Sequence, residues 1–187
     1  RYFIDTEFNS EIPQIELISI GITSEDERDY YAISSEYDPE KCSDWVKRHV
    51  FPLLGNDEPK PLKQIANEIY EFVDGKGADK WTRAEIQNQQ HEFWGYYADW
   101  DWFLLGQNVM GGMMRLPERW PMLCLDVKQF SMHLGGVFFP PLSTLTAHNA
   151  LADAIWTKEY WQHLKTKEKS DTICGLCGDN LRNMPNF

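Results

Sequence analysis

The chain has 187 residues, of which 42% are hydrophobic and 14% aromatic, and it carries a formal net charge of −11. This length predicts one globular domain over residues 1–187, with a core over 1–167 and a polar C-terminal tail over 168–187. The acidic balance argues against a broad phosphate-binding surface and so against a DNA-coating protein. It does not exclude an enzyme that reaches phosphates through an acidic pocket filled by divalent cations.

The lack of a recognisable targeting signal and the low number of cysteines predict an intracellular protein. No run of about eighteen apolar residues occurs, and residues 1–5 lack the regions of a secretory signal. The four cysteines are too few and too unevenly spaced for a disulfide scaffold. These features predict a cytoplasmic location, in a bacterium or a phage-infected cell, and no membrane partner.

Three strands are predicted in succession at the start of the chain. Residues 2–8 alternate bulky and polar side chains, and residues 15–23 alternate apolar side chains with small or polar ones. A third strand, residues 29–34, follows the polar turn over residues 24–28. This succession favours an antiparallel meander.

Helices and a further strand follow. Residues 40–50 and 60–73 have apolar side chains at helical spacing, and Gly75 ends the second helix. A fourth strand is predicted over residues 92–97, after which residues 98–105 take up helical spacing. Strands and helices in this order give a mixed α/β fold with helices covering the sheet.

The last part of the chain is less regular. Residues 110–121 are predicted to form a loop that leads into a short element over 123–127. A long final helix is predicted to begin near Ala147 and to continue through Leu164. The RNase H-like fold is one fold with this order of elements.

The first chemical signal is the pair of carboxylates in Asp5-Thr6-Glu7, on the predicted opening strand. Side chains two positions apart on a strand share one face and lie about 7 Å apart along the backbone. Both carboxylates can therefore reach one pair of cations, and oxygen ligands of this kind suit Mg²⁺ or Mn²⁺. An Asp-x-Glu on a strand is also common on a solvated face, so this pair alone does not decide between the two roles.

The second signal is the pair His148 and Asp153, at the predicted start of the last helix. Small residues between them would allow both side chains to point into one cleft, with the Asp as a metal ligand and the His facing a water molecule. A helix cap is the alternative, because side-chain oxygens near a helix start often accept hydrogen bonds from backbone amides. The spacing alone leaves both interpretations open.

The third signal is a pair of acids, Asp99 and Asp101, directly after the predicted fourth strand. Acids at the start of a helix also interact favourably with the helix dipole. The local pattern does not choose between the two residues.

Together these signals resemble the DEDD exonuclease superfamily. The spacing of His148 and Asp153 is similar to that of its DEDDh branch, and Asn149 stands where the other branch has a tyrosine. Within the DEDDh branch the chain is similar to a small bacterial and phage group of 3′-to-5′ exoribonucleases first recognised in mycobacteria. That similarity is carried by residues 1–8, 15–21, 30–34, 38–40 and 45–46.

The resemblance implies an RNase H-like five-stranded sheet, with three antiparallel strands followed by two parallel ones and flanked by helices. It selects Asp101 over Asp99, because Trp100 stands where the superfamily has an aromatic residue before the acid. It also implies that His148 is the general base. The implied ligands of two divalent cations, Mg²⁺ or Mn²⁺, are Asp5, Glu7, Asp101 and Asp153.

The implied reaction is hydrolysis of single-stranded RNA from its 3′ end with release of 5′-mononucleotides. Two cations would activate water and stabilise the leaving 3′ oxygen, while His148 takes the proton of the attacking water. Phe8 and Trp102 are the predicted stacking partners of the terminal base, since stacking tolerates any base. Both also fit a core role, Trp102 more than Phe8. Glu16, on the adjacent strand, either supports the metal site or lies in solvent.

Several alternatives stay open. A DNA 3′-to-5′ exonuclease or an oligoribonuclease for short RNA would use the same residues with different contacts to the sugar. A catalytically silent RNase H-like module that binds nucleic acid is the non-enzymatic alternative. A homodimer rests on analogy with related enzymes. Cys174 and Cys177 have the spacing of half a zinc site, but no second pair accompanies them, so ordinary thiols are favoured.

Overall fold

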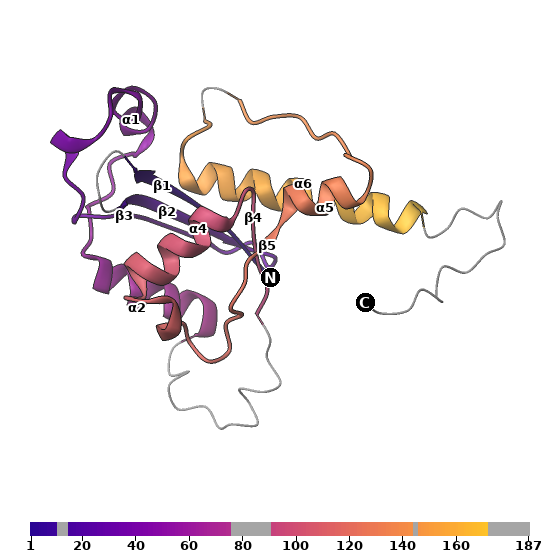
Figure 1. The fold of residues 1–187 in the computed structure, drawn as a ribbon, viewed down its shortest axis with the longest axis horizontal. Helices are drawn as coiled ribbons and strands as arrows, with labels where there is room; N and C mark the ends of the chain where they lie inside the picture. Colours follow the sequence, from indigo (N-terminus) through magenta and orange to yellow (C-terminus); the bar gives the residue numbers. More distant parts are fainter. Residues whose placement is uncertain (11–14, 76–90, 144–145, 172–187) are drawn as a thin grey trace.

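The computed structural model describes residues 1–10, 15–75, 91–143 and 146–171, and its centre is a five-stranded mixed sheet (Figure 1). The strands are β1 (Tyr2–Asn9), β2 (Glu16–Ser24), β3 (Asp29–Ile33), β4 (Phe93–Gly95) and β5 (Leu125–Asp126). Their order is β3-β2-β1-β4-β5, with antiparallel pairing among the first three and parallel pairing of β1 with β4 and of β4 with β5. This arrangement confirms the predicted α/β fold class and is consistent with an RNase H-like fold.

Helices cover both faces of the sheet. Figure 1 shows α5 and α6 on one side of it and α2 and α4 on the other. None of the helices in the described part of the chain is long and apolar enough to cross a membrane. The α-helices are α1 (Asp44–His49), α2 (Leu62–Asp74), α4 (Asp99–Leu104), α5 (Val127–His133) and α6 (Ala150–Asp171). Single turns are η1 (Pro39–Lys41), η2 (Phe51–Leu53) and η5 (Met113–Arg115), and the π-helix η4 (Leu105–Val109) extends α4.

Strand β1 distributes its side chains between these two layers. Tyr2 and Ile4 belong to the core that α2 and α4 share, whereas Phe3 packs against Trp161 of α6 at a ring distance of 5.5 Å. Successive side chains of a strand point to opposite faces. The odd-numbered positions that follow, Asp5 and Glu7, therefore lie on the face covered by α6.

The predicted helix over residues 60–73 is confirmed as α2. Ile65, Ile69 and Val73 recur every four residues, so they form one buried stripe against the sheet. The helix ends at Gly75, whose φ of 85° is easily adopted by glycine. Strand β3 lies partly over this helix, where the Tyr30 hydroxyl donates a 3.0 Å hydrogen bond to Glu68.

Other elements differ from the predicted ranges for local reasons. Strand β4 ends at Gly95 instead of extending to residue 97, because Tyr97 takes a left-handed conformation with φ of 57° before α4 begins. Helix α1 starts only after Ser43, whose hydroxyl accepts a hydrogen bond from Val46 N and caps it. The chain between residues 123 and 133 holds β5 and then α5, a helix that the sequence pattern did not indicate.

A buried ionic cluster holds the sheet near the N-terminal end of β1. Oxygen atoms of Asp74 lie 2.6 Å from Arg119 Nη2, 2.8 Å from His91 Nε2 and 3.0 Å from Trp120 Nε1. The cluster joins the end of α2 to His91, two residues before β4, and to the loop after η5. The Asp74 side chain has no exposed surface, so its charge requires these partners.

Candidate active site

The candidate site lies where β1 extends past its parallel neighbour. Strand β4 pairs with β1 only at Tyr2 and Phe3, so the later part of β1 has no strand partner on that side. The chain leaves β4 through a short turn and enters α4, which packs beside this part of β1. A crevice at the carboxyl ends of adjacent parallel strands is the usual ligand site of such sheets.

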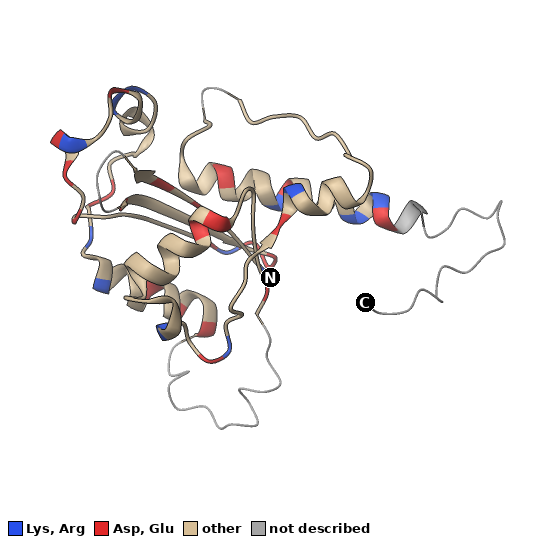
Figure 2. Ribbon diagram, in the orientation of Figure 1, with Lys and Arg blue, Asp and Glu red and all other residues tan. Residues whose placement is uncertain are grey.

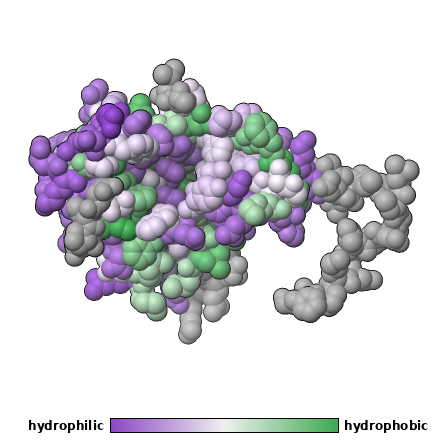
Figure 3. All heavy atoms as spheres, turned by 45° about the horizontal axis from the view of Figure 1, so that its top comes forward, coloured by the Kyte–Doolittle hydropathy of each residue, from purple (hydrophilic) through white to green (hydrophobic). Residues whose placement is uncertain are grey.

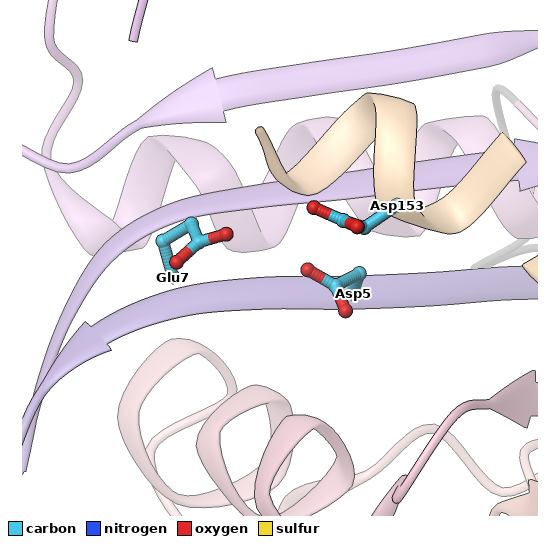
Figure 4. Close-up of side chains that lie close together, drawn as sticks. All are labelled: Asp5, Glu7 and Asp153. Carbon is cyan, nitrogen blue, oxygen red and sulfur yellow. The ribbon is translucent and has the colours of Figure 1, made fainter. Parts of the chain in front are cut away.

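Three of the predicted acids meet on this part of β1. Asp5, Glu7 and Asp153 each offer a carboxylate oxygen, and these oxygens all lie within 4.8 Å of one another. Figure 4 shows Asp5 and Glu7 side by side on β1, with Asp153 reaching toward them from the first turns of α6. Residues 148 positions apart in the chain thus form one group of oxygen donors, which we call the acidic cluster.

Asp101 lies beside the acidic cluster, held at the edge of β1. Its Oδ1 accepts hydrogen bonds from the backbone nitrogen of Thr6 at 2.9 Å and from Thr6 Oγ1 at 2.6 Å. The residue is 5% exposed, whereas Asp99 on the same helix is exposed. The charge of Asp101 raises the pKa of Asp5, so the two carboxyls interact.

Burial and mutual repulsion shift these carboxyls strongly. Burial, followed by the charges of Asp153 and Asp101, raises the pKa of Glu7 to about 8. Burial also raises the pKa of Asp5 well above its usual value, and it raises that of Asp101 to about 7 against the opposing hydrogen bonds from Thr6. The pKa of Asp153 is raised by burial as well. Crowded acids of this kind gain stability from a cation in their midst.

The distribution of charge around the site is uneven. Figure 2 shows acidic residues on β1, on α4 and near the start of α6, whereas basic residues lie on the outer helices and along the later part of α6. Among the described residues, none of the four acids forms an ion pair with a lysine or an arginine. A positively charged ligand is therefore what the site lacks and what its oxygens suit.

His148 and Asp153 are joined by a turn at the start of α6. The backbone nitrogen of His148 donates a 2.8 Å hydrogen bond to Asp153 Oδ2, and His148 has a left-handed φ of 74°. Asn149 caps the helix, since its Oδ1 accepts from Ala152 N at 3.0 Å. Its amide nitrogen also donates to Leu53 O at 2.7 Å. The His-x4-Asp spacing is thus a hydrogen-bonded turn that presents the histidine next to the acidic cluster.

Two residues of α1 contact the ring of His148. Trp45 lies edge to face with it at 4.8 Å, and His49, which stacks on Trp45 at 4.8 Å, also lies edge to face with His148 at 6.5 Å. The indole of Trp45 is 47% exposed, so it borders the site on the solvent side. No sequence pattern indicated that Trp45 or His49 lies at the site, because only the packing of α1 against the His148 turn brings them there.

A close approach between β2 and α6 sets the height of Asp153 above the sheet. A Cβ atom at Gly21 would lie 2.3 Å from the carbonyl carbon of Ala150. Gly21 is paired with Asp5 across the strands. Only a glycine therefore allows the first turn of α6 to rest on the sheet directly opposite Asp5.

The residues predicted to hold the substrate lie in different places. Phe8 stacks on Trp100 at 5.9 Å with an interplanar angle of 26°, and Trp100 is 52% exposed. Trp102 is 5% exposed and packs in the core, where its ring lies 4.9 Å from Phe93. Glu16 Oε2 accepts a hydrogen bond from Asp38 N at 3.1 Å and lies outside the acidic cluster.

The predicted half zinc site, Cys174 and Cys177, lies outside the described residues, as does the tail after residue 171. Cys42 is a buried free thiol in the core beside α1. Cys124 is free and partly buried near β5. The described part of the chain thus brings neither of these two cysteines into the acidic cluster.

A mixed sheet of this topology, with acids from β1 and α6 in one cluster, is consistent with the class of RNase H-like proteins. Residues 1–165 match the family described as the 3′-5′ exoribonuclease Rv2179c-like domain, and the chain belongs to this family. The predicted similarity to the mycobacterial-type group is thereby confirmed.

Two curated relatives come from Mycobacterium tuberculosis. They are the 3′-5′ exoribonuclease Rv2179c of strain ATCC 25618 / H37Rv and the 3′-5′ exoribonuclease MT2234.1 of strain CDC 1551 / Oshkosh. Each is 36% identical to this chain over 161 residues, which cover 82% of the chain and 86% of the relative. The similarity therefore extends over nearly the whole described structure.

Proposed function

We propose that this protein is a metal-dependent 3′-to-5′ exoribonuclease of the DEDDh type, which releases 5′-mononucleotides from single-stranded RNA. The observation that carries this proposal is the meeting of Asp5, Glu7 and Asp153 within 4.8 Å, with His148 on the same turn as Asp153. The relatives from M. tuberculosis are named 3′-5′ exoribonucleases, which supports RNA as the substrate.

The donor set fits two divalent cations, Mg²⁺ or Mn²⁺. Asp5, Glu7, Asp101 and Asp153 would hold them, because hard carboxylate oxygens are the ligands these ions prefer and because burial and neighbouring carboxyls, which raise the pKa values of Asp5 and Glu7, make negative charge costly there without a cation. When bound, the cations would polarise the scissile phosphate and neutralise charge on the leaving 3′ oxygen.

His148 is the proposed general base. The hydrogen bond from its backbone to Asp153 and the edge contact with Trp45 hold its ring beside the acidic cluster. There it would take the proton of the water that attacks the phosphorus, a role for which histidine is the commonest side chain.

The terminal base would stack on the aromatic pair of Phe8 and Trp100. Phe8 follows Glu7 directly on β1 and Trp100 precedes Asp101 on α4, and the half-exposed Trp100 leaves part of this aromatic pair open to solvent. Stacking on such a surface contributes about 1–3 kcal/mol per base and tolerates any base. Trp102 does not share this surface, because its ring is enclosed in the core. A homodimer and a cytoplasmic location stay predictions of the sequence.

Digestion of labelled nucleic acid tests the proposal. Single-stranded RNA and DNA of one sequence, labelled at the 5′ end, are incubated with Mg²⁺, Mn²⁺ or EDTA and with the parent protein, His148→Ala or the control His133→Ala. His133 is exposed on α5 and serves as a matched control. We expect a metal-dependent ladder that shortens from the 3′ end, faster for RNA, and lost only in His148→Ala.

The other outcomes separate the alternatives. Faster shortening of DNA than of RNA would indicate a DNA exonuclease instead of an exoribonuclease. Cleavage of RNAs of two to five residues alone would indicate an oligoribonuclease. Absence of shortening under every condition would reject the enzyme and favour the silent binding module.

A further inference from the structure

A second hollow adjoins the acidic cluster on the side of α6. It has a volume of about 490 Å³ and lies between α6, α5 and the loop of residues 137–142. Asp153 forms part of its wall, so the hollow and the acidic cluster are neighbours. Its size is in the range of small-ligand pockets, which is about 300–1,000 Å³. Its aromatic wall is made of Tyr96, Phe138, Phe139, Trp156 and Tyr160.

Hydrogen bonds and ring stacking hold the wall in place. Trp156 Nε1 donates to Pro140 O at 2.8 Å, and the Tyr160 hydroxyl lies 2.7 Å from Val137 O. The ring of Phe139 stacks parallel to that of Tyr160 at 5.0 Å. These contacts fasten the loop to α6, so the hollow is preformed, which lowers the entropy that binding costs.

The charge and polarity of the hollow suit a nucleotide. Lys128 of α5 lines it and forms no ion pair among the described residues, in a chain whose net charge is −11. Phe138 is 76% exposed at its rim, and Figure 3 shows apolar side chains at the surface over α5 and α6. Aromatic faces with one cation nearby are the elements that bind single-stranded RNA.

The direction of the elements places the hollow opposite the Phe8–Trp100 pair. Phe3, near the start of β1, packs on Trp161, whereas Gly21, the strand partner of Asp5, lies under Ala150. Helix α6 therefore runs antiparallel to β1. Trp156 and Tyr160 lie toward the start of β1, and Phe8 lies beyond Glu7 at its other end, with the acidic cluster between them.

We infer that this hollow binds the nucleotide on the 5′ side of the scissile phosphate, the second nucleotide from the 3′ end. Its base would lie between the aromatic side chains and its phosphate near Lys128. The inference rests on the proposed function, in which the terminal base stacks on Phe8 and Trp100. The two nucleotides joined by the scissile phosphate would then lie on opposite sides of the acidic cluster.

Binding of modified tetranucleotides tests this subsite. Three single-stranded RNAs labelled with fluorescein at the 5′ end are compared by fluorescence anisotropy: an intact one, one without a base at the second position from the 3′ end, and one without the 3′-terminal base. Ca²⁺ replaces Mg²⁺, since its flexible coordination favours binding over turnover. The variants are Phe138→Ala and Lys128→Gln, with Phe103→Ala and Lys63→Gln as controls on exposed positions of α4 and α2.

We expect loss of the second base to weaken binding to the parent about 10-fold, as stacking energies imply. In Phe138→Ala the intact RNA should bind about 10-fold more weakly, and the penalty for the missing second base should fall below about 2-fold. Lys128→Gln should reduce the dependence of affinity on salt by about one ion. The penalty for the missing terminal base should stay unchanged in both variants.

The subsite is rejected if loss of the second base weakens binding to Phe138→Ala as much as binding to the parent. It is also rejected if Phe138→Ala changes the effect of losing the terminal base instead. The binding measurement does not depend on turnover. If Phe138→Ala removes the penalty for the missing second base but the protein never shortens RNA, the proposed exonuclease activity is rejected and the subsite is supported. If the protein shortens RNA but Phe138→Ala does not change this penalty, only the subsite is rejected. Failure to bind any of the three RNAs would reject both.

Discussion

Thr6 donates two hydrogen bonds to a single oxygen of Asp101, one from its backbone nitrogen at 2.9 Å and one from its hydroxyl at 2.6 Å. Thr6 stands between Asp5 and Glu7 in the chain, but its side chain points to the opposite face of β1. The strand that carries two acids of the site thus also fixes the orientation of a third acid, on α4.

Thr6→Val should weaken the hold on Asp101 without removing any acid. The backbone hydrogen bond stays, but the hydroxyl bond is lost and a methyl group faces the buried carboxylate, which costs about 1–3 kcal/mol. We expect about a 10-fold loss of kcat/KM on RNA and a higher Mg²⁺ concentration at half-maximal rate. The measurement is a Mg²⁺ titration of RNA digestion. Thr6→Ser keeps the hydroxyl and should behave like the parent, and an unchanged Mg²⁺ dependence in Thr6→Val would contradict the idea.

His148→Ala should separate proton transfer from metal binding. Its side chain is absent from the acidic cluster, and the hydrogen bond to Asp153 comes from its backbone, which alanine retains. The rate should fall by about 10²–10⁴, the usual contribution of a general base, and the dependence of kcat on pH should change. Mn²⁺ binding, measured by calorimetry, should be close to that of the parent. Asp153→Asn should instead lose Mn²⁺ affinity, and weak Mn²⁺ binding by His148→Ala would argue for a ligand role.

Without cations, the acidic cluster should make the fold less stable as pH rises. Burial raises the pKa of Glu7 from 4.5 to about 8, so the folded protein holds a proton there that the unfolded chain releases. A carboxyl with a raised folded pKa lowers the free energy of unfolding as pH rises through this window. In EDTA at pH 8, Glu7→Gln should therefore exceed the parent in stability by roughly 2–4 kcal/mol.

The comparison is made by denaturant unfolding in EDTA near the two ends of that window, pH 4.5 and pH 8. The difference between Glu7→Gln and the parent should nearly vanish at the lower pH, where the carboxyl is protonated in the folded state and already half protonated in the unfolded chain. Saturating Mn²⁺ should stabilise the parent at the higher pH. Glu118→Gln, at an exposed position, is the control. Equal differences in the free energy of unfolding at both pH values would show that ionisation of Glu7 does not destabilise the folded protein.

Gly21→Ala should damage stability and activity together. The new Cβ would lie 2.3 Å from backbone atoms of Ala150 and Leu151, so α6 must move away from β2. Overpacking of this kind costs about 1–3 kcal/mol or more. We expect a lower Tm and weaker Mn²⁺ binding, because Asp153 is carried by the displaced turn. Gly135→Ala meets no atom within 4 Å but has a φ of 83°, so it should lose stability through its backbone alone and keep Mn²⁺ affinity.

The local sequence pattern was sufficient to predict those strands and helices whose geometry depends on neighbouring residues alone. The alternation over residues 2–8 predicted β1 with Asp5 and Glu7 on one face, and the stripe of Ile65, Ile69 and Val73 predicted α2. These features depend on the period of a strand or a helix, which neighbouring residues determine. The order of strands and helices restricts the topology to a mixed α/β fold, and the five-stranded sheet that the family resemblance implied is confirmed.

Contacts between distant segments were not accessible to the same reasoning. Nothing near Trp45 indicates that it lies against His148, and nothing near Thr6 shows that Asp101 occupies the free edge of β1. The seven residues of α5 have no strong apolar period, and the helix forms because Asp126 caps it and Val127 is buried against the sheet. The choice between Asp99 and Asp101 likewise depends on burial, which differs between them only in the folded chain.

The alternation of β1 has a consequence for how the family can vary. Between residues 4 and 7 its even-numbered positions stabilise the fold, since Ile4 fills the core and Thr6 holds Asp101, while Asp5 and Glu7 belong to the acidic cluster. In a library of substitutions scored separately for protein abundance and for turnover, these four positions should show a period of two. Changes at one parity would deplete the protein, and changes at the other would leave abundant but inert molecules.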